Sequence, residues 1–164
     1  MYHARGDYDQ ALKYYQQSLS ISREIGDKAG EGATLNNIGQ IYKARGDYEQ
    51  ALNYLQESLS ISREIGDRAG MIPTLHNMAH LHIQNGQVEE ALKKFIEALQ
   101  LARETRNAEG MLNVSRSMGI LLCQLGNKKE GLPLLRQALQ LGRAMGHPGV
   151  AQIEAFLRQF EEED

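Results

Sequence analysis

The hydrophobic positions of this chain follow the period of an α-helix. In the stretch that begins at Asp47, one helical face carries the apolar side chains Ala51, Leu52, Leu55, Leu59 and Ile65. The following stretch has a similar stripe of Leu75, Met78, Ala79 and His82. No segment alternates between apolar and polar residues with period two, as a half-buried strand would. The pattern therefore predicts an all-α fold built from helices of about eighteen residues.

The helical pattern returns every 40 residues. The sequence GDYDQAL at 6–12 recurs as GDYEQAL at 46–52, and residues 5–30 match residues 45–70 at 21 of 26 positions. A fixed period of this length predicts a solenoid, in which each unit buries its apolar face against its neighbours. We expect a single array that consists of a partial first repeat at 1–27, full units at 28–67, 68–107 and 108–147, and a capping helix at 148–164.

Glycines and capping residues divide each period into two helices. A glycine such as Gly46 suits the left-handed position after a helix, and Asp47 with Gln50 three residues later forms a capping box. The same arrangement predicts helix starts at three further pairs, which are Asp7/Gln10, Gln87/Glu90 and Asn127/Glu130. Asp27 and Asp67 are candidate caps for the other helix of each period.

Composition and charge limit the kinds of partner and the cellular location that we expect for this protein. The chain has 18 basic and 21 acidic residues and a formal net charge of -3, which does not favour nucleic acid or a membrane surface as partner. Cys123 is the only cysteine, so no intramolecular disulfide can form. Neither a signal-peptide pattern nor a membrane-spanning stretch is visible, and by default we expect a cytoplasmic location.

The repeat resembles the tetratricopeptide repeat, whose signature is W-x2-L-G-x2-Y followed by A-x3-F. The matching positions are Leu35, Ile38, Gly39, Tyr42, Ala51 and Leu55 in the second unit, Leu75, Met78, Ala79, His82, Ala91 and Phe95 in the third, Ser115, Met118, Gly119, Leu122, Gly131 and Leu135 in the fourth, and Tyr2, Ala11 and Tyr15 in the first. The period departs from the family's usual 34 residues. This longer variety is similar to repeats of adaptors that regulate heterotrimeric G proteins and orient spindles, and to repeats in prokaryotic signalling proteins.

The resemblance implies a right-handed superhelix of antiparallel helix pairs whose first helices line a concave groove for a peptide or protein segment. Carried over to this sequence, the groove residues are Asn36, Gln40, Lys43, His76, His80, Gln84, Arg116 and Gln124, with Ile120 among them. Their amides and mild cations favour a peptide of acidic character. The alternative for these residues is a solvated polar face without a ligand. The Lys and Asn pattern of the chaperone-binding repeats is absent.

The sequence gives little indication of catalysis or of metal binding. His76 and His80 are spaced i, i+4 and His82 is nearby, but no third ligand shares their face, so we expect no metal site and no cofactor. Cys123 lies in an apolar stretch without a paired histidine. We therefore expect a protein-interaction module and not an enzyme.

The two ends of the array differ. The last helix has an apolar stripe with Ile153, Leu157 and Phe160, which is typical of a terminal cap. At the other end, the helix that starts at Asp7 lacks the first-helix partner of its counterparts. We expect a homodimer through the side chains Ala11, Leu12, Tyr15 and Leu19, which would otherwise face water. The alternative function is therefore a self-assembling structural element, or a sensor for an attached effector domain.

Overall fold

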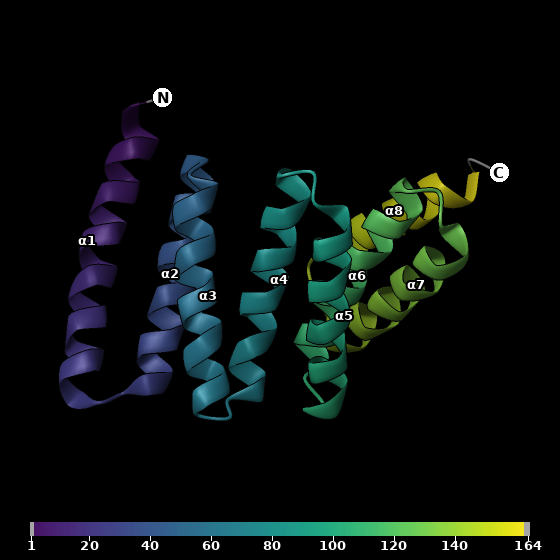
Figure 1. The fold of residues 1–164 in the computed structure, drawn as a ribbon. Coiled ribbons are helices and arrows are strands. Elements are labelled where there is room, and N and C mark those ends of the chain that lie inside the picture. The colour runs from purple at the N-terminus through teal and green to yellow at the C-terminus, as the bar shows by residue number, and fades with distance from the viewer. Residues whose placement is uncertain (1, 163–164) are drawn as a thin grey trace. The chain divides into compact units, whose positions relative to one another are not determined.

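The structure of the protein is a computed structural model that describes the backbone of residues 2–162 and the side chains of residues 7–162. Within residues 2–162 it contains helices and no strand, and consecutive helices are joined by short turns (Figure 1). The helices are α1 (Tyr2–Ile25), α2 (Lys28–Arg45), α3 (Tyr48–Glu64), α4 (Arg68–Gln84), α5 (Val88–Glu104), α6 (Ala108–Gln124), α7 (Lys128–Met145) and α8 (Val150–Glu162).

The helix starts and ends follow the capping pattern of the sequence at most positions. The side chain of Asp47 accepts a hydrogen bond from the backbone N–H of Gln50, and that of Asp67 accepts one from Gly70. Gly46 adopts a left-handed φ of 80° at the end of α2. Gln87 differs from the prediction, because its side-chain oxygen lies 2.7 Å from His82 Nδ1.

The predicted helix start at Asp7 is wrong. Helix α1 runs without a turn from Tyr2 to Ile25, although its sequence at Gly6–Asp7 equals that at Gly46–Asp47. The physical reason is that a glycine inside a helix costs only about 1 kcal/mol and continued helix adds backbone hydrogen bonds. The turn at Gly46 is compensated by the packing of α2 against α3.

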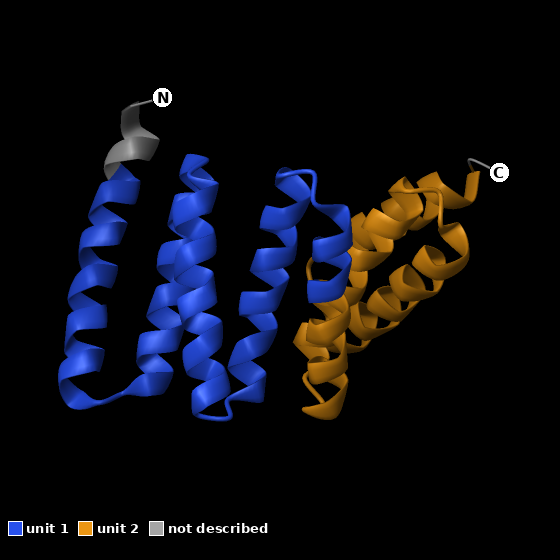
Figure 2. Ribbon diagram, in the orientation of Figure 1, with its two compact units in different colours: residues 1–94 blue, residues 95–164 orange. Residues whose placement is uncertain are grey.

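The chain divides into two compact units, residues 1–94 and residues 95–164 (Figure 2). The boundary falls within α5, so that unit 1 holds α1 to α4 and unit 2 holds α6 to α8.

One core cluster of unit 1 lies between α1, α2 and α3. Its buried members are Leu12, Leu19, Leu35, Ile38 and Ile61. Helices α2 and α3 approach closely at Gly39, where an added Cβ atom would lie 2.9 Å from Leu55 Cγ and 3.2 Å from the backbone oxygen of Ala51. The predicted pairing of a small residue on the first helix with a large one on the second is therefore present, and Ala51 is fully buried as the repeat signature requires.

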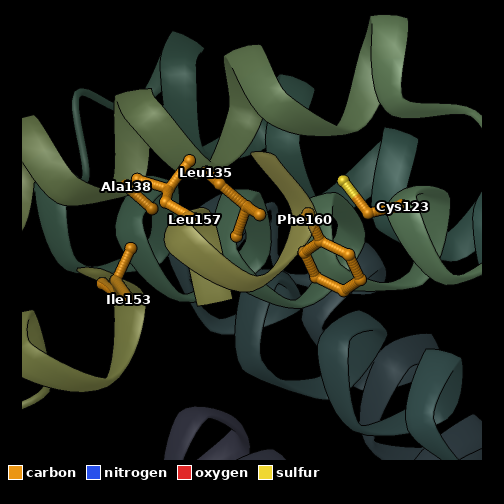
Figure 3. Close-up of a cluster of buried hydrophobic side chains, with 6 residues drawn as sticks. All are labelled: Cys123, Leu135, Ala138, Ile153, Leu157 and Phe160. Carbon is orange, nitrogen blue, oxygen red and sulfur yellow. The ribbon is translucent and has the colours of Figure 1, made fainter. Parts of the chain in front are cut away.

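One core cluster of unit 2 lies between α6, α7 and α8. Figure 3 shows its members, which are Cys123, Leu135, Ala138, Ile153, Leu157 and Phe160. Gly119 on α6 repeats the role of Gly39, since a Cβ atom there would lie 2.9 Å from Leu135 Cγ. Helix α8 buries the apolar stripe that the sequence assigned to the last helix.

Candidate peptide-binding groove

Six of the predicted groove residues lie on the first helices of unit 1, Asn36, Gln40 and Lys43 on α2 and His76, His80 and Gln84 on α4. Asn36 is only 8% exposed, and its side-chain oxygen accepts a hydrogen bond of 3.0 Å from Asn77 Nδ2. Asn36 thus holds α2 against α4 and presents little surface to a ligand. The other five are half-buried or exposed.

A polar cavity of about 570 Å³ gathers three of these residues in unit 1. It lies where α2 ends and α3 begins, with α4 beside it. Its lining consists of Gln40, Lys43, Ala44, Arg45, Gly46, Tyr48 and Gln84. Arg45 and Tyr48 were not predicted, because the sequence around Gly46 and Asp47 indicated only a turn between two helices. The structure therefore brings Gln40, Lys43 and Gln84 together around one polar hollow.

The cavity presents the ammonium group of Lys43, which has no counter-ion among the described side chains. Burial lowers the pKa of the Lys43 ammonium group, because taking a charged group out of water disfavours its charged form. Among the described side chains, neither a carboxylate nor another acceptor lies within hydrogen-bonding distance of this group. Arg45, on the rim of the same cavity, forms an ion pair with Asp9 of α1. An anionic group entering the cavity would supply the missing partner of Lys43.

The two groove histidines contact each other on α4. His76 Nε2 and His80 Nε2 lie 3.3 Å apart, and the two rings meet edge to face with centroids 4.6 Å apart. Both side chains are half-buried. His82 does not join this pair, because its Nδ1 atom faces Gln87. Among the described residues, no group of three or more His, Cys, Asp and Glu side chains is arranged to hold a metal ion.

The remaining predicted groove residues, Arg116 and Gln124, belong to α6 in unit 2. Gln124 is exposed and Arg116 is half-buried, with its guanidinium group close to Gly149 at the start of α8. Ile120 is partly buried and packs against the core cluster that contains Leu135.

A second hollow, of about 650 Å³, lies in unit 2 and was not predicted. It is formed by α5, α6 and α7, and its apolar lining includes Ile96, Met118 and Leu134. Arg103, Lys129, Glu104 and Glu130 surround it with charges of both signs. The only sequence signal for it is Ile96, a large apolar residue at a position that is polar in the other units.

The predicted self-association residues are buried or half-buried within the chain. Leu12 and Leu19 are buried against α2, and Ala11 and Tyr15 are half-buried. Among the described side chains of α1, the exposed large apolar ones are Tyr14, Ile21 and Ile25. Ile21 is 57% exposed, whereas its repeat counterpart Ile61 is 7% exposed in the core of unit 1.

Cys123 is buried beside Gly131, and burial raises the pKa of its thiol. This is the environment of a packing residue and not of a nucleophile, because nucleophilic attack requires the thiolate. In the part of the chain that the structure describes, no helix combines the length and the apolar character needed to cross a membrane.

Comparison with known proteins agrees with this architecture. The sequence model of the tetratricopeptide repeat matches residues 1–64 and 70–144, and the chain therefore belongs to the tetratricopeptide repeat family. This confirms the predicted family and the all-α fold class. A search of curated proteins found no match.

Two solved structures illustrate the likeness of fold. BtubC (BKLC) from P. vanneervenii superposes with a TM-score of 0.82 at 15% sequence identity, covering 95% of this chain and 66% of that one. The chain thus spans slightly less than two thirds of that protein. A kinesin light chain-like protein from Podosopora anserina with nearly identical TPR-like repeats gives a TM-score of 0.70 at 18% identity, covering 98% of this chain and 81% of that one.

Proposed function

We propose that the chain is a protein-interaction module that binds a peptide or protein segment bearing an acidic group. Repeat proteins of this kind generally offer extended surfaces to partners. The proposed binding face lies in unit 1 and consists of the groove residues of α2 and α4 that are exposed or half-buried. The observation that carries the proposal is the polar cavity around Lys43.

The acidic preference follows from the electrostatics of that cavity. A half-buried ammonium group without a counter-ion is costly, and a carboxylate that enters the cavity removes this cost. The side-chain amides of Gln40 and Gln84 can donate further hydrogen bonds to the same carboxylate or to the peptide backbone. The cavity thus favours a peptide that places an Asp, a Glu or its own terminal carboxylate at this point.

The experiment selects peptides on the wild-type chain from a library that varies in acidic content, and then measures their affinity for variants. Lys43→Gln should weaken binding of the selected peptides by about tenfold or more, roughly 1.4 kcal/mol, because the ionic hydrogen bond is lost. Lys13→Gln is the matched control, since Lys13 is an exposed lysine on α1. It should leave affinity unchanged.

The Lys43→Met variant distinguishes a loss of peptide affinity from a loss of folding stability. The methionine keeps the length of the side chain but removes the desolvated charge, so the melting temperature should stay the same or rise while affinity falls. Selection of peptides without acidic residues would contradict the proposal. So would an affinity that is equal for the wild type and the Lys43→Gln variant.

The second candidate function is self-association through α1. The exposure of Ile21, set against the burial of its counterpart Ile61, is the observation that favours it. Two copies that meet around a two-fold axis would cover Tyr14, Ile21 and Ile25 on both chains. Sedimentation should then show a dimer that Ile21→Lys disrupts and that Ile96→Lys, at an exposed position of α5, does not. A monomer at all accessible concentrations would exclude this candidate.

A further inference from the structure

We propose that His76 and His80 form a two-histidine binding site for a divalent transition-metal ion of the zinc class. This inference concerns a metal and is independent of whether a peptide binds near Lys43. It starts from the position of the two rings, which lie one helical turn apart on the same face of α4 and point their Nε2 atoms at each other.

The distance between the two Nε2 atoms equals the distance between two nitrogen ligands of a tetrahedral zinc ion. Zinc–imidazole bonds measure 2.0–2.1 Å, and two such bonds at a tetrahedral angle place the nitrogens about 3.3–3.4 Å apart. His76 Nε2 and His80 Nε2 are already 3.3 Å apart. Binding therefore requires rotation of the rings about their own bonds and no movement of the helix.

Metal binding does not require the neutral histidine pair to lose a proton. The proton on Nε2 of the donor ring can be exchanged for one on Nδ1 of the same ring. In a neutral pair, one Nε2 atom carries a hydrogen and donates it to the other. A metal ion needs the lone pairs of both Nε2 atoms, so the donor ring must change to the tautomer protonated at Nδ1. The ion then replaces the hydrogen bond between the two rings by two coordinate bonds.

Helix α4 holds the two ligands in place. Asp67 caps its first turn by accepting a hydrogen bond from Gly70, and the buried residues Leu75, Met78 and Ala79 anchor the helix in the interior of unit 1. Both histidines are half-buried, so their rotamers are restricted but solvent reaches them. A chelating pair on a fixed helix loses little freedom when the ion binds.

The coordination sphere sets the choice of metal. Imidazole nitrogen suits zinc, copper, nickel and cobalt, whereas calcium and magnesium require oxygen ligands. Among the described residues no third His, Cys, Asp or Glu completes a metal-binding group, so water occupies the other positions. The absence of a third protein ligand was the reason for expecting no metal from the sequence. It makes the site open and exchangeable and does not prevent binding.

The test titrates the full chain with zinc chloride alone at pH 7.5 in a non-chelating buffer, followed by calorimetry. We expect one zinc ion per chain with an affinity that falls about tenfold or more in His76→Ala and in His80→Ala. His82→Ala and His147→Ala are the matched controls and should bind as the wild type does. His76→Gln with His80→Gln keeps polar side chains at both positions, in case the alanine variants unfold.

Two further measurements identify the ligands. Cobalt in place of zinc should give visible absorption bands of a nitrogen-bound ion in the wild type and lose them in the double glutamine variant. Nuclear magnetic resonance of the imidazole nitrogens should show both Nε2 signals shifting on addition of zinc. Zinc affinity that is unchanged in the double variant would overturn the proposal, as would the absence of binding at millimolar zinc.

Discussion

At the scale of single residues, one turn of the array has Arg106 where the equivalent turns have a glycine with positive φ. The glycines that follow α1 and α3, Gly26 and Gly66, have φ values of 72° and 69°. The equivalent position after α5 holds Arg106, the one described non-glycine residue with positive φ, at 53°. The turn geometry is thus the same with or without glycine. An L-residue in this region is strained by about 1–2 kcal/mol.

Arg106→Gly should therefore stabilise the protein by about 0.5–1 kcal/mol, because relief of the strain exceeds the extra chain entropy of glycine in the unfolded state. The reciprocal change Gly66→Arg should destabilise it by a similar amount, since an added Cβ atom there meets nothing within 4 Å and only the backbone conformation opposes it. Chemical denaturation of both variants measures the two effects. Equal stability of Arg106→Gly and the wild type would show that the turn is not strained.

At the scale of helices, a buried carboxylate ties α1 to α2. Glu31 is 5% exposed and accepts hydrogen bonds from Arg23 Nε at 2.7 Å and from Lys28 Nζ at 3.0 Å. Arg23 also pairs with Glu57 of α3. The sequence did not predict this cluster, because the next repeat has Met71 in place of Glu31. It is a feature of one repeat and not of the family pattern.

The cluster predicts a pH dependence of stability. The hydrogen bond from Arg23, and next the one from Lys28, lower the pKa of Glu31 below its ordinary value of about 4.5. A carboxylate whose pKa is lower in the folded state stabilises the fold above the unfolded-state pKa, and this contribution disappears as pH falls through the folded-state pKa. The free energy of unfolding should therefore fall below about pH 4.5.

Urea denaturation of Glu31→Gln at several pH values measures this contribution. The variant should be less stable than the wild type at pH 7, and the difference should shrink as pH falls below about 4.5. Glu24→Gln, at an exposed position on α1, is the control and should follow the wild type throughout. A Glu31→Gln penalty that is the same at pH 7 and at low pH would contradict an ionic origin.

At the scale of the whole molecule, each unit builds its core from contacts between neighbouring helices. In unit 1 the cluster joins α1, α2 and α3, and in unit 2 it joins α6, α7 and α8. Cys123 lies within the second cluster and is the only thiol of the chain. Its reactivity therefore reports directly on the opening of unit 2.

We expect Cys123 to resist alkylation in the native protein. Burial raises the pKa of its thiol, so the reactive thiolate is scarce at neutral pH, and the surrounding core excludes the reagent. Mass spectrometry after treatment with iodoacetamide should show slow labelling in buffer and rapid labelling in denaturant. Rapid labelling of a protein with native circular dichroism would show that α8 does not cover the cluster stably.

The class of fold, most helix ends and the packing stripes can be predicted from the sequence. These features are local, because helical periodicity, an Asp cap and a glycine after a helix act within a few residues. The close approaches at Gly39 and Gly119 were also readable, since the repeat signature encodes which small residue faces which large one. The repetition strengthened each inference, because the same pattern occurs in several units.

Which polar residues pair with a neighbouring helix and which apolar residues face water depends on the tertiary structure. Asn36 lies at a predicted groove position, but its side chain is hydrogen-bonded to Asn77. Leu12 of α1 is covered by α2, whereas Ile21 on the same helix is exposed. The i, i+4 spacing placed His76 and His80 on one face, but the cavity at Lys43 and the 3.3 Å distance between the two Nε2 atoms come from the structure. The physical reason is that exposure and pairing depend on how closely separate helices approach, and on the rotamers their side chains adopt there.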